Sequence, residues 1–583
     1  MSKEKKEESY NGGDLLVQCL LNEGVEYIFG IVGGQLLAIY DAVNRWGKDK
    51  GIDTIMTRHE QAAGHMADGY ARVTGKIGVC MGTVGPGVTH LIPAVAAAYM
   101  DSIPLLVIGA QILRVEDRKG VYQGDVQQIE MLRPITKFQI RVELPNEIPG
   151  AVRACFIEAL SGRQRPVFLE IRESALTGRV SKEIMEQIWS PELYRPQTKP
   201  FGDPKQIEKA LELLKNATKP FLVAGGGVMR SGAWEELRKF SIKYKIPIGT
   251  TPNGLGALGE DDETFVGTSV GPTYMQNTAK TADVVMAVGC KWDFTLFFGG
   301  APLWGPNQKT IHVDIDPQVI GLNRKTDIGI VADAKAALIQ ILEKSKDYLK
   351  ENQFSEWNVQ VQEYKEKRKQ LELKPKISEK VPIQTQRLLN EIFNFFPKET
   401  IFAIDGGDLA TFCWMQVNTK HRPPRSNIAS ISMGHLGVGI PYVIGAKFAF
   451  PDKPCVNIVG DGSFLFNVQE LDTAIRYKLP IINIIANNYA WGMIKSGQKY
   501  GWDKRFYNVD LIGTDYAQIA KGFGCYGETV EKPEDIKPAF QRAIDSGLPA
   551  VINVIMEFKT PDATKILQTM KKAVIKKAQK ANR

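Results

Sequence analysis

The chain has 583 residues, an apolar fraction of 44%, a formal net charge of +8 and seven scattered cysteines. This length predicts three or four domains, and the apolar content is that of an ordinary globular protein. Cysteines without a CxxC pair argue against a zinc site or a disulfide framework, and no nucleic-acid-binding motif accompanies the modest charge. The charged start has no apolar core, and no apolar run is long enough to span a membrane. We therefore expect a cytoplasmic protein.

Short apolar runs alternate with helical patterns in the first part of the chain, over 12–180. A helix is expected at 61–73, and a proline-containing linker at 172–204. The runs predict buried strands at 27–32, 53–56, 77–82 and 105–109. This alternation is typical of a doubly wound α/β domain with a parallel sheet.

A second α/β unit is predicted over 200–345, with strands at 221–224, 284–288 and 311–315. Its first strand is followed by three glycines that do not complete GxGxxG and indicate a dinucleotide site only weakly. The Lys/Glu-rich stretch 343–380 predicts a surface helix between domains.

A third α/β unit is predicted over 380–560, with a strand at 401–404, and it resembles the first unit in layout, which suggests duplication of one fold. The predicted fold is thus three doubly wound parallel-sheet domains. The basic tail 561–583 has two interpretations, a solvated helix end or a contact for the phosphates of coenzyme A.

Two neighbouring strands of the third unit, predicted at 456–459 and 481–485, end in polar residues. Open α/β sheets bind ligands at such strand ends. The carboxylate of Asp461 and the amide oxygen of Asn488 suit Mg²⁺, which completes its coordination with phosphate and water. The GDG at 460–462 and the Asn pair could each be a simple turn, but 24 residues separate Gly462 from Asn487 with a helix-period pattern between them.

Glu60 follows a predicted strand at the start of a predicted helix. The helix dipole stabilises a carboxylate there, so a purely structural charge is one interpretation. A buried glutamate with a raised pKa that moves protons is the other, and the metal motif elsewhere in the chain favours it.

The GDG, spacer and NN pattern resembles the thiamin diphosphate motif. Three further segments, RHEQAAGHMADGYAR, GTVGPGVTH and AAYMDSIP, resemble the acetohydroxyacid synthase group of thiamin diphosphate enzymes. The resemblance covers roughly 12–560 and implies thiamin diphosphate held by Mg²⁺ on Asp461, Asn488 and the backbone carbonyl of Ala490. It also implies that Glu60 stabilises the imino tautomer of the coenzyme across a subunit interface. A homodimer at least, and a homotetramer as the expected assembly, follow from that.

The same resemblance assigns roles to further residues. Leu436, in GHLGVGIP, falls where a bulky apolar residue holds the coenzyme bent, although it could also be ordinary core. Gln123, after Tyr122, falls where the group has a substrate-facing amide, although it could be a surface residue. The coenzyme-binding positions implied are Gly34, Gly85, Gly406, Asp408, Gly434, Leu436, Gly460, Asp461, Gly462, Ser463, Asn488, Ala490, Trp491, Gly492 and Met493.

The middle domain contains PFLVAGGGVMRSGA and IHVDIDPQVIG, which resemble segments that bind FAD in acetohydroxyacid synthases. In related acyl-CoA enzymes the equivalent domain binds ADP or no nucleotide, so FAD, ADP and an empty domain all stay open. The nucleotide-contact positions carried over are Arg163, Gly225, Gly226, Asp314 and Asp333.

Two departures bear on the reaction. Gly497 stands where the synthases carry a tryptophan, and Thr295 stands where they carry an arginine that contacts the second keto acid. The segment KWDFTLFFG instead resembles 2-hydroxyacyl-CoA lyases, and NYAWG resembles benzaldehyde lyase. We expect acetolactate-synthase-like decarboxylation and carboligation of 2-keto acids, with a lyase of 2-hydroxyacyl-CoA or 2-hydroxy ketones as the alternative. A non-catalytic subunit would have lost Glu60, Asp461 or Asn488.

Overall fold

The computed structural model describes residues 10–270, 274–416, 422–562, 564–565, 568–569 and 571–572. The chain divides into two compact units. The first unit comprises the chain up to Thr198 together with Pro441–Pro451 and Asp472–Tyr477, and the second unit comprises the rest. Most of the predicted basic tail lies outside the described residues.

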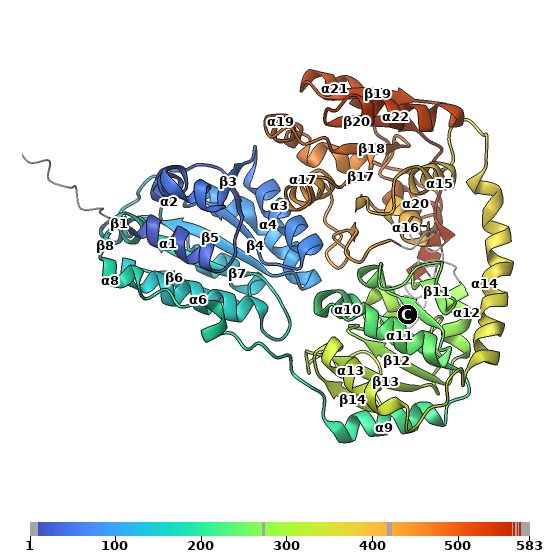
Figure 1. Ribbon diagram of the computed structural model, residues 1–583. Coiled ribbons are helices and arrows are strands. Elements are labelled where there is room, and N and C mark those ends of the chain that lie inside the picture. Colours follow the sequence, from blue (N-terminus) through green and yellow to red (C-terminus); the bar gives the residue numbers. More distant parts are fainter. Residues whose placement is uncertain are drawn as a thin grey trace, which may run out of the picture. The chain divides into compact units, whose positions relative to one another are not determined.

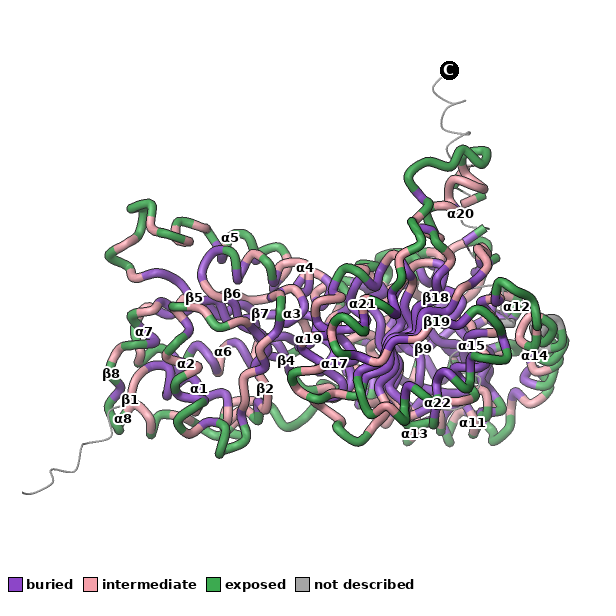
Figure 2. The backbone as a smooth tube through the Cα atoms, turned by 90° about the horizontal axis from the view of Figure 1, so that it is seen from above, coloured by how far each residue is buried: buried purple, intermediate pink, exposed green. Residues whose placement is uncertain are grey.

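A six-stranded parallel sheet forms the centre of the first unit (Figure 1), with the strand order β3-β2-β4-β5-β7-β6. Every residue of β5 and β7 is buried (Figure 2), as expected for central strands covered on both faces. The four predicted strands are confirmed, with ends shifted by at most two residues. The strands are β2 (Tyr27–Gly30), β3 (Asp53–Met56), β4 (Gly78–Gly82), β5 (Leu105–Gln111), β6 (Phe138–Val142) and β7 (Val167–Arg172).

The linker predicted at 172–204 has regular secondary structure in its first half. This stretch contains the short helices α7 (Glu173–Thr177) and α8 (Lys182–Met185). Between them β8 (Arg179–Val180) pairs antiparallel with β1 (Tyr10–Asn11). The segment therefore folds back onto the start of the first unit, where Val180 joins its apolar core.

Helix α3 (Glu60–Thr74) is buried almost all round because it packs between the sheet and other helices, including α4 (Pro86–Asp101). Two of its buried residues, Asp68 and Arg72, form ion pairs inside the protein. Arg72 binds Asp68 at 2.7 Å and Asp101 at 3.1 Å. Removing one partner of such a buried pair is strongly destabilising. These contacts fix α3 and thereby place Glu60 at its first position.

The second unit contains two six-stranded parallel sheets. In the first of them the order is β11-β10-β9-β12-β13-β14, which is 3-2-1-4-5-6 along the chain, the order of dinucleotide-binding folds. The strands predicted at 221–224, 284–288 and 311–315 are confirmed as β9, β12 and β13. The strands are β9 (Pro220–Ala224), β10 (Ile248–Thr250), β11 (Phe265–Thr268), β12 (Val284–Val288), β13 (Lys309–Asp314) and β14 (Ile328–Val331).

The last sheet has the order β16-β15-β17-β18-β20-β19. Numbered along the chain this is 2-1-3-4-6-5, the same order as in the first unit, so the predicted likeness of layout is confirmed. Of the stretch 343–380 predicted as a surface helix, α14 (Ser355–Lys376) forms the larger part, whereas residues 343–345 end the preceding helix. The strands are β15 (Ile401–Asp405), β16 (Asn427–Ile428), β17 (Cys455–Gly460), β18 (Ile482–Asn487), β19 (Tyr526–Val530) and β20 (Ala550–Ile555). Among the described helices, none is long and apolar enough to cross a membrane.

Candidate functional site

Asp461 joins the carboxyl ends of two adjacent strands, β17 and β18. It directly follows β17, and one carboxylate oxygen accepts a hydrogen bond from the backbone N–H of Gly462 at 2.9 Å. The other oxygen accepts from the N–H groups of Asn488 and Ala490 at 3.1 and 3.2 Å. Burial raises the pKa of the Asp461 carboxyl to about 6. A buried carboxylate held by backbone donors is a fixed anionic anchor at the strand ends.

Asn488 places its side-chain oxygen beside this anchor. The Oδ1 atom is buried and has no hydrogen-bond partner among the described residues. An unpartnered buried amide oxygen is costly, and a hard cation is the partner that a carboxylate and an amide oxygen suit best. The predicted ligands Asp461, Asn488 and Ala490 thus come together, and their donor set fits Mg²⁺.

Gly462 is required here for reasons of space. A Cβ atom on this residue would lie 2.7 Å from the ring of Trp491. The predicted helix between the two strands is broken, however, into α18 (Asp461–Phe464), a 3₁₀ turn (Leu465–Asn467) and α19 (Glu470–Arg476). The segment is thus helical, as the pattern predicts, but interrupted near Asn467, whose side-chain amide donates to the carbonyl of Gly437 at 2.7 Å.

Asp405 holds the loop that carries Leu436. It ends β15, is buried, and accepts from the N–H groups of Gly437 and Gly439 at 3.3 and 2.9 Å. Burial raises its pKa to about 6. Leu436 itself is half-buried, unlike the fully buried core residues around β15. Sequence reasoning missed Asp405, although a carboxylate at the end of a buried strand was a usable signal.

Asp408 begins α16 (Asp408–Gln416) and is buried. Its two oxygens accept from the hydroxyls of Ser496 and Thr564 at 2.6 and 2.8 Å. Ser496 lies on α20 (Gly492–Gly501), which follows the Asn488 segment. Burial raises the pKa of Asp408 to about 6. Asp408 therefore links α20 to the beginning of the predicted tail.

The remaining predicted coenzyme positions of the second unit surround the same strand ends. Ser463 is buried in α18, and Met493 packs so closely that a Cβ on Gly407 would lie 2.8 Å from it. Positive φ angles of 135° and 64° at two positions need glycine. The other positions are Gly406 and Gly434, which carry those angles, Gly460, which ends β17, and Trp491 and Gly492, at the start of α20.

In the first unit, Glu60 is the first residue of α3 and is buried. Its Oε2 atom lies 3.0 Å from Nδ1 of His90, on α4. The preceding His59 caps α3, because its Nδ1 accepts from the N–H of Gln61 at 3.1 Å. Sequence reasoning did not single out His90, since nothing local ties it to Glu60.

Gln123 lies on a loop that touches Gly85. Both residues have positive φ, 63° and 73° respectively, and a Cβ on Gly85 would lie 2.5 Å from the carbonyl oxygen of Gln123. Gln123 is half-buried, whereas Tyr122 is 84% exposed. Gly34, predicted for the same site, is exposed and begins a 3₁₀ turn that ends at the buried Leu36.

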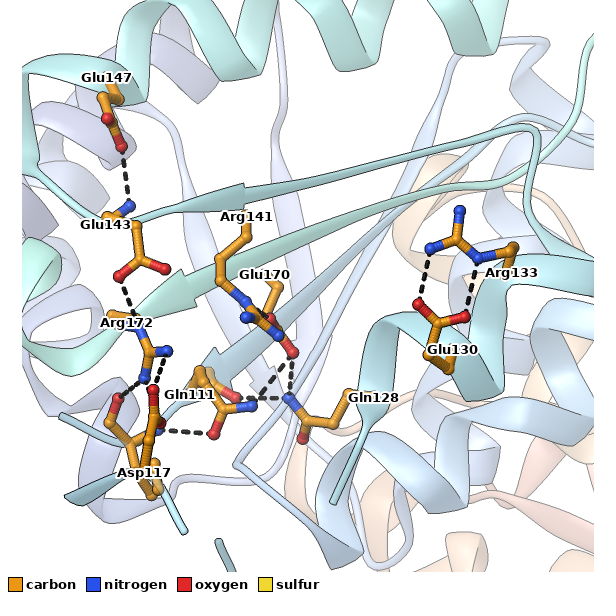
Figure 3. A network of polar contacts seen from close by, with 12 residues as sticks. Gln111, Asp117, Gln128, Glu130, Arg133, Arg141, Glu143, Glu147, Glu170 and Arg172 are labelled. Carbon is orange, nitrogen blue, oxygen red and sulfur yellow. Dashed lines mark hydrogen bonds and ion pairs between the residues drawn. The ribbon is translucent and has the colours of Figure 1, made fainter. Parts of the chain in front are cut away.

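Gln128 is the fully buried centre of a polar network beneath this loop (Figure 3). Its oxygen accepts from the N–H of Gly85 at 2.9 Å. Its NH₂ group donates to the carbonyl of Ala110 at 3.0 Å and to Glu170 at 2.9 Å. Glu170 is fully buried and pairs with Arg141. Sequence reasoning missed this network.

Arg172 fixes the beginning of the loop in the same network (Figure 3). Its guanidinium donates to both oxygens of Asp117 at 2.9 and 2.7 Å and to the carbonyl of Ile112 at 2.9 Å. A bidentate pair of this kind is strong and directional. Near the other end, Asp125 accepts from two backbone N–H groups of the loop.

The predicted nucleotide positions are divided between the units. Arg163 belongs to the first unit and donates to the hydroxyl of Ser102 at 2.9 Å. In the second unit Asp333 caps α13 (Ala334–Ser345) and accepts from the hydroxyl of Ser231 at 2.7 Å. The others lie at the carboxyl ends of strands: Gly225 and Gly226 follow β9, and Asp314 is the last residue of β13.

Thr295 and Gly497 mark the departures from the synthase pattern. The Thr295 side chain is buried, and its hydroxyl donates to Asp293 at 2.6 Å. Gly497 lies on α20, where an added Cβ would approach Gln568 at 3.7 Å and no described atom more closely.

Comparison with known proteins gives three matches to thiamine pyrophosphate enzyme models. The N-terminal TPP binding domain matches residues 10–131, the central domain 207–341 and the C-terminal TPP binding domain 405–554. These matches divide the chain as its three parallel sheets do.

Several relatives that match most of the chain are acetolactate synthase large subunits. The probable acetolactate synthase large subunit of Methanocaldococcus jannaschii is 35% identical over 94% of this chain and 92% of its own length. The Haemophilus influenzae acetolactate synthase large subunit is 33% identical over 91% and 92%. The Escherichia coli acetolactate synthase isozyme 3 large subunit is 32% identical over 92% and 93%. The chain belongs to the thiamine pyrophosphate enzyme family.

Proposed function

We propose that this protein is a thiamin diphosphate-dependent carboligase that decarboxylates a 2-keto acid such as pyruvate and joins the remaining fragment to a second 2-keto acid. The observation that carries this proposal is the identity of 32–35% to acetolactate synthases over more than nine-tenths of the chain. The retained Glu60, Asp461 and Asn488 support an active enzyme rather than a non-catalytic subunit.

The residues of the second unit would hold the coenzyme through a cation. Asp461, Asn488 and the carbonyl of Ala490 are the proposed Mg²⁺ ligands, and the unpartnered Oδ1 of Asn488 supports this assignment. Bound thiamin diphosphate supplies an electron sink for the carbanion left when CO₂ departs. Leu436 supports the coenzyme, Glu60 moves a proton at its pyrimidine, and Gln123 donates to a substrate oxygen.

The domains are 12–180, 200–345 and 380–560, followed by the tail. The enzyme works as a homodimer or homotetramer in the cytoplasm; the seven free, buried cysteines agree with a reducing compartment. The central sheet, with its dinucleotide-fold order, holds FAD or ADP, or has lost its nucleotide.

A lyase acting on 2-hydroxyacyl-CoA or 2-hydroxy ketones is the second candidate. The observation that favours it is Thr295, whose hydroxyl is already bonded to Asp293. A neutral, engaged hydroxyl offers no cation to the carboxylate of a second keto acid. Gly497, on α20, likewise lacks the aromatic side chain that the synthases carry at this position.

One assay separates these functions. The purified protein is given thiamin diphosphate and Mg²⁺, and pyruvate consumption is followed beside cleavage of a 2-hydroxyacyl-CoA and of benzoin. Acetolactate formation supports the carboligase, and a flavin absorbance would identify FAD. Aldehyde release from the CoA ester or from benzoin, without acetolactate, would show that the protein is a lyase.

A further inference from the structure

His90 and Glu60 form a contact between two helices. Nδ1 of His90, in the second turn of α4, lies 3.0 Å from Oε2 of Glu60, at the start of α3. The Glu60 side chain is 10% exposed and the His90 side chain is 46% exposed. The partly exposed ring of His90 therefore contacts one oxygen of the nearly buried Glu60 carboxylate.

The surroundings of this pair supply little competing charge. The ring of His59 lies against that of His90 in a tilted arrangement, with centroids 4.5 Å apart and planes inclined by 32°. Burial lowers the pKa of His59, and burial raises that of Tyr40, so both are neutral near pH 7. Arg58, the nearest cation along the chain, pairs with Asp472 at 3.7 Å. His90 is thus the imidazole that forms a hydrogen bond with the Glu60 carboxylate.

A metal ion is a different occupant for the same side chains, since His59, Glu60 and His90 place ligand atoms within 4.8 Å of one another. The geometry favours the hydrogen bond. Nδ1 of His59 already accepts the hydrogen bond that caps α3, so this atom is not available to an ion. The Glu60–His90 distance is that of an ordinary N–H···O hydrogen bond.

We propose that His90 is a positioning residue for Glu60: its Nδ1–H donates to Oε2 and leaves Oε1 directed at the coenzyme pyrimidine. This inference rests on the proposed role of Glu60. A carboxylate without this donor turns freely about its last torsion, which is broad for glutamate. Hydrogen bonds to charged groups are the stronger class, so losing this one should lower kcat by about 10- to 100-fold with little change in KM.

Three substitutions test which ring atom matters. In His90→Asn the amide nitrogen takes the place of Nδ1, and in His90→Gln it takes the place of Nε2; His90→Ala has no donor. We expect Asn to retain most of kcat, and Gln and Ala to lose it. Wild-type kcat in the Gln variant, or an equal loss in all three, overturns the proposal. The Gln variant suits this exposed position even if the Ala variant does not fold.

A second readout needs neither coenzyme nor turnover. The sequence has six histidines, so ¹⁵N-histidine NMR of the coenzyme-free protein can assign His90 by substitution. We expect an Nδ1-protonated ring in the wild type and a change to the Nε2-protonated form in Glu60→Ala. An Nε2-protonated ring in both proteins overturns the hydrogen bond. Normal turnover in Glu60→Gln with the NMR change present would instead refute the role of Glu60 and leave the contact intact.

Discussion

The backbone N–H of Gly85 donates to Oε1 of the fully buried Gln128 at 2.9 Å. This bond connects the segment around Gly85, which contacts Gln123, to strands β5 and β7 of the first sheet, because Gln128 also bonds residues of those strands. The Gln128 amide also donates to Ala110 and Glu170 (Figure 3), so one side chain satisfies three buried groups. The loop geometry therefore depends on a residue with no proposed contact to the substrate.

Gln128→Met should remove all three bonds while keeping the volume. Unpaired buried groups cost about 1–3 kcal/mol each, so we expect a clear fall in the thermal midpoint. The catalytic efficiency kcat/KM should fall at least about tenfold, because a small misplacement of a substrate-positioning loop is costly. The matched control is Glu130→Gln on the same helix, α5 (Gln128–Leu132), whose pair with Arg133 is exposed. Equal effects in both variants would contradict the prediction.

Glu60→Gln should separate proton transfer from binding. Glutamine keeps the shape of the side chain and an oxygen for His90, but it cannot gain or lose the catalytic proton. We expect turnover to fall by about 10²- to 10⁴-fold, while coenzyme affinity, followed by calorimetric titration, changes only a few-fold. Turnover near that of the wild type would refute the catalytic assignment.

The strands could be predicted because their signal is local. Val284–Val288 is an unbroken apolar run between an aspartate and a glycine, and the structure buries all of it as β12. The broken helix after Asp461 could not be predicted. Its break depends on the bond from Asn467 to Gly437, which joins residues 30 positions apart and leaves no trace in the periodicity.

Some residues of the candidate site could be predicted from the sequence and others could not. Asp461 and Asn488 belong to a motif of fixed spacing and could be found from the sequence. Gln128 and His90 could not, since each acts through a partner brought near by the fold, 43 and 30 positions away respectively. Asp405 was within reach, because it directly precedes a glycine already assigned to the site.

Asn488→Leu should have opposite effects on stability and on cofactor binding. The wild-type Oδ1 is buried without a partner among the described residues, so an apolar side chain of similar size should leave the metal-free protein as stable or more stable. The same change removes a proposed Mg²⁺ ligand. Mg²⁺-dependent binding of thiamin diphosphate should weaken at least about tenfold, near 1.4 kcal/mol. A loss of metal-free stability with unchanged binding would contradict both expectations.

Asp408→Asn should reveal how burial of one carboxyl affects stability. Burial raises its pKa to about 6 in the folded protein, from about 3.9 in an unfolded chain. The folded state therefore prefers the neutral form, and the stability that Asp408 contributes is full below about pH 4 and is lost as the pH rises through about 6. The shift corresponds to roughly 3 kcal/mol.

Thermal midpoints of wild type and Asp408→Asn at pH 4.5, 5.5 and 7 check this expectation. The wild type should lose stability relative to the variant across this range, and the difference should then stay constant. Asp510→Asn, at an exposed carboxylate paired with Lys495, is the control and should show no such trend. A wild type that gains stability relative to Asp408→Asn as the pH rises would show that the sign is wrong.

Gly497→Trp and Gly497→Ala should show whether the missing aromatic side chain sets the product. An added Cβ would lie at an ordinary van der Waals distance of 3.7 Å from Gln568, its nearest neighbour among the described residues outside its own helix, so the Ala variant fits. Replacing a helical glycine with alanine stabilises a helix by about 0.5–1 kcal/mol, so the Ala variant should melt slightly higher and form the same products. The Trp variant restores the aromatic side chain that the synthases carry here. A contact between two aromatic groups contributes about 0.5–1.5 kcal/mol. Acetolactate formed per pyruvate consumed should rise about two- to tenfold in the Trp variant alone. An equal rise in the Ala variant would mean that helix stability, rather than the ring, controls the outcome.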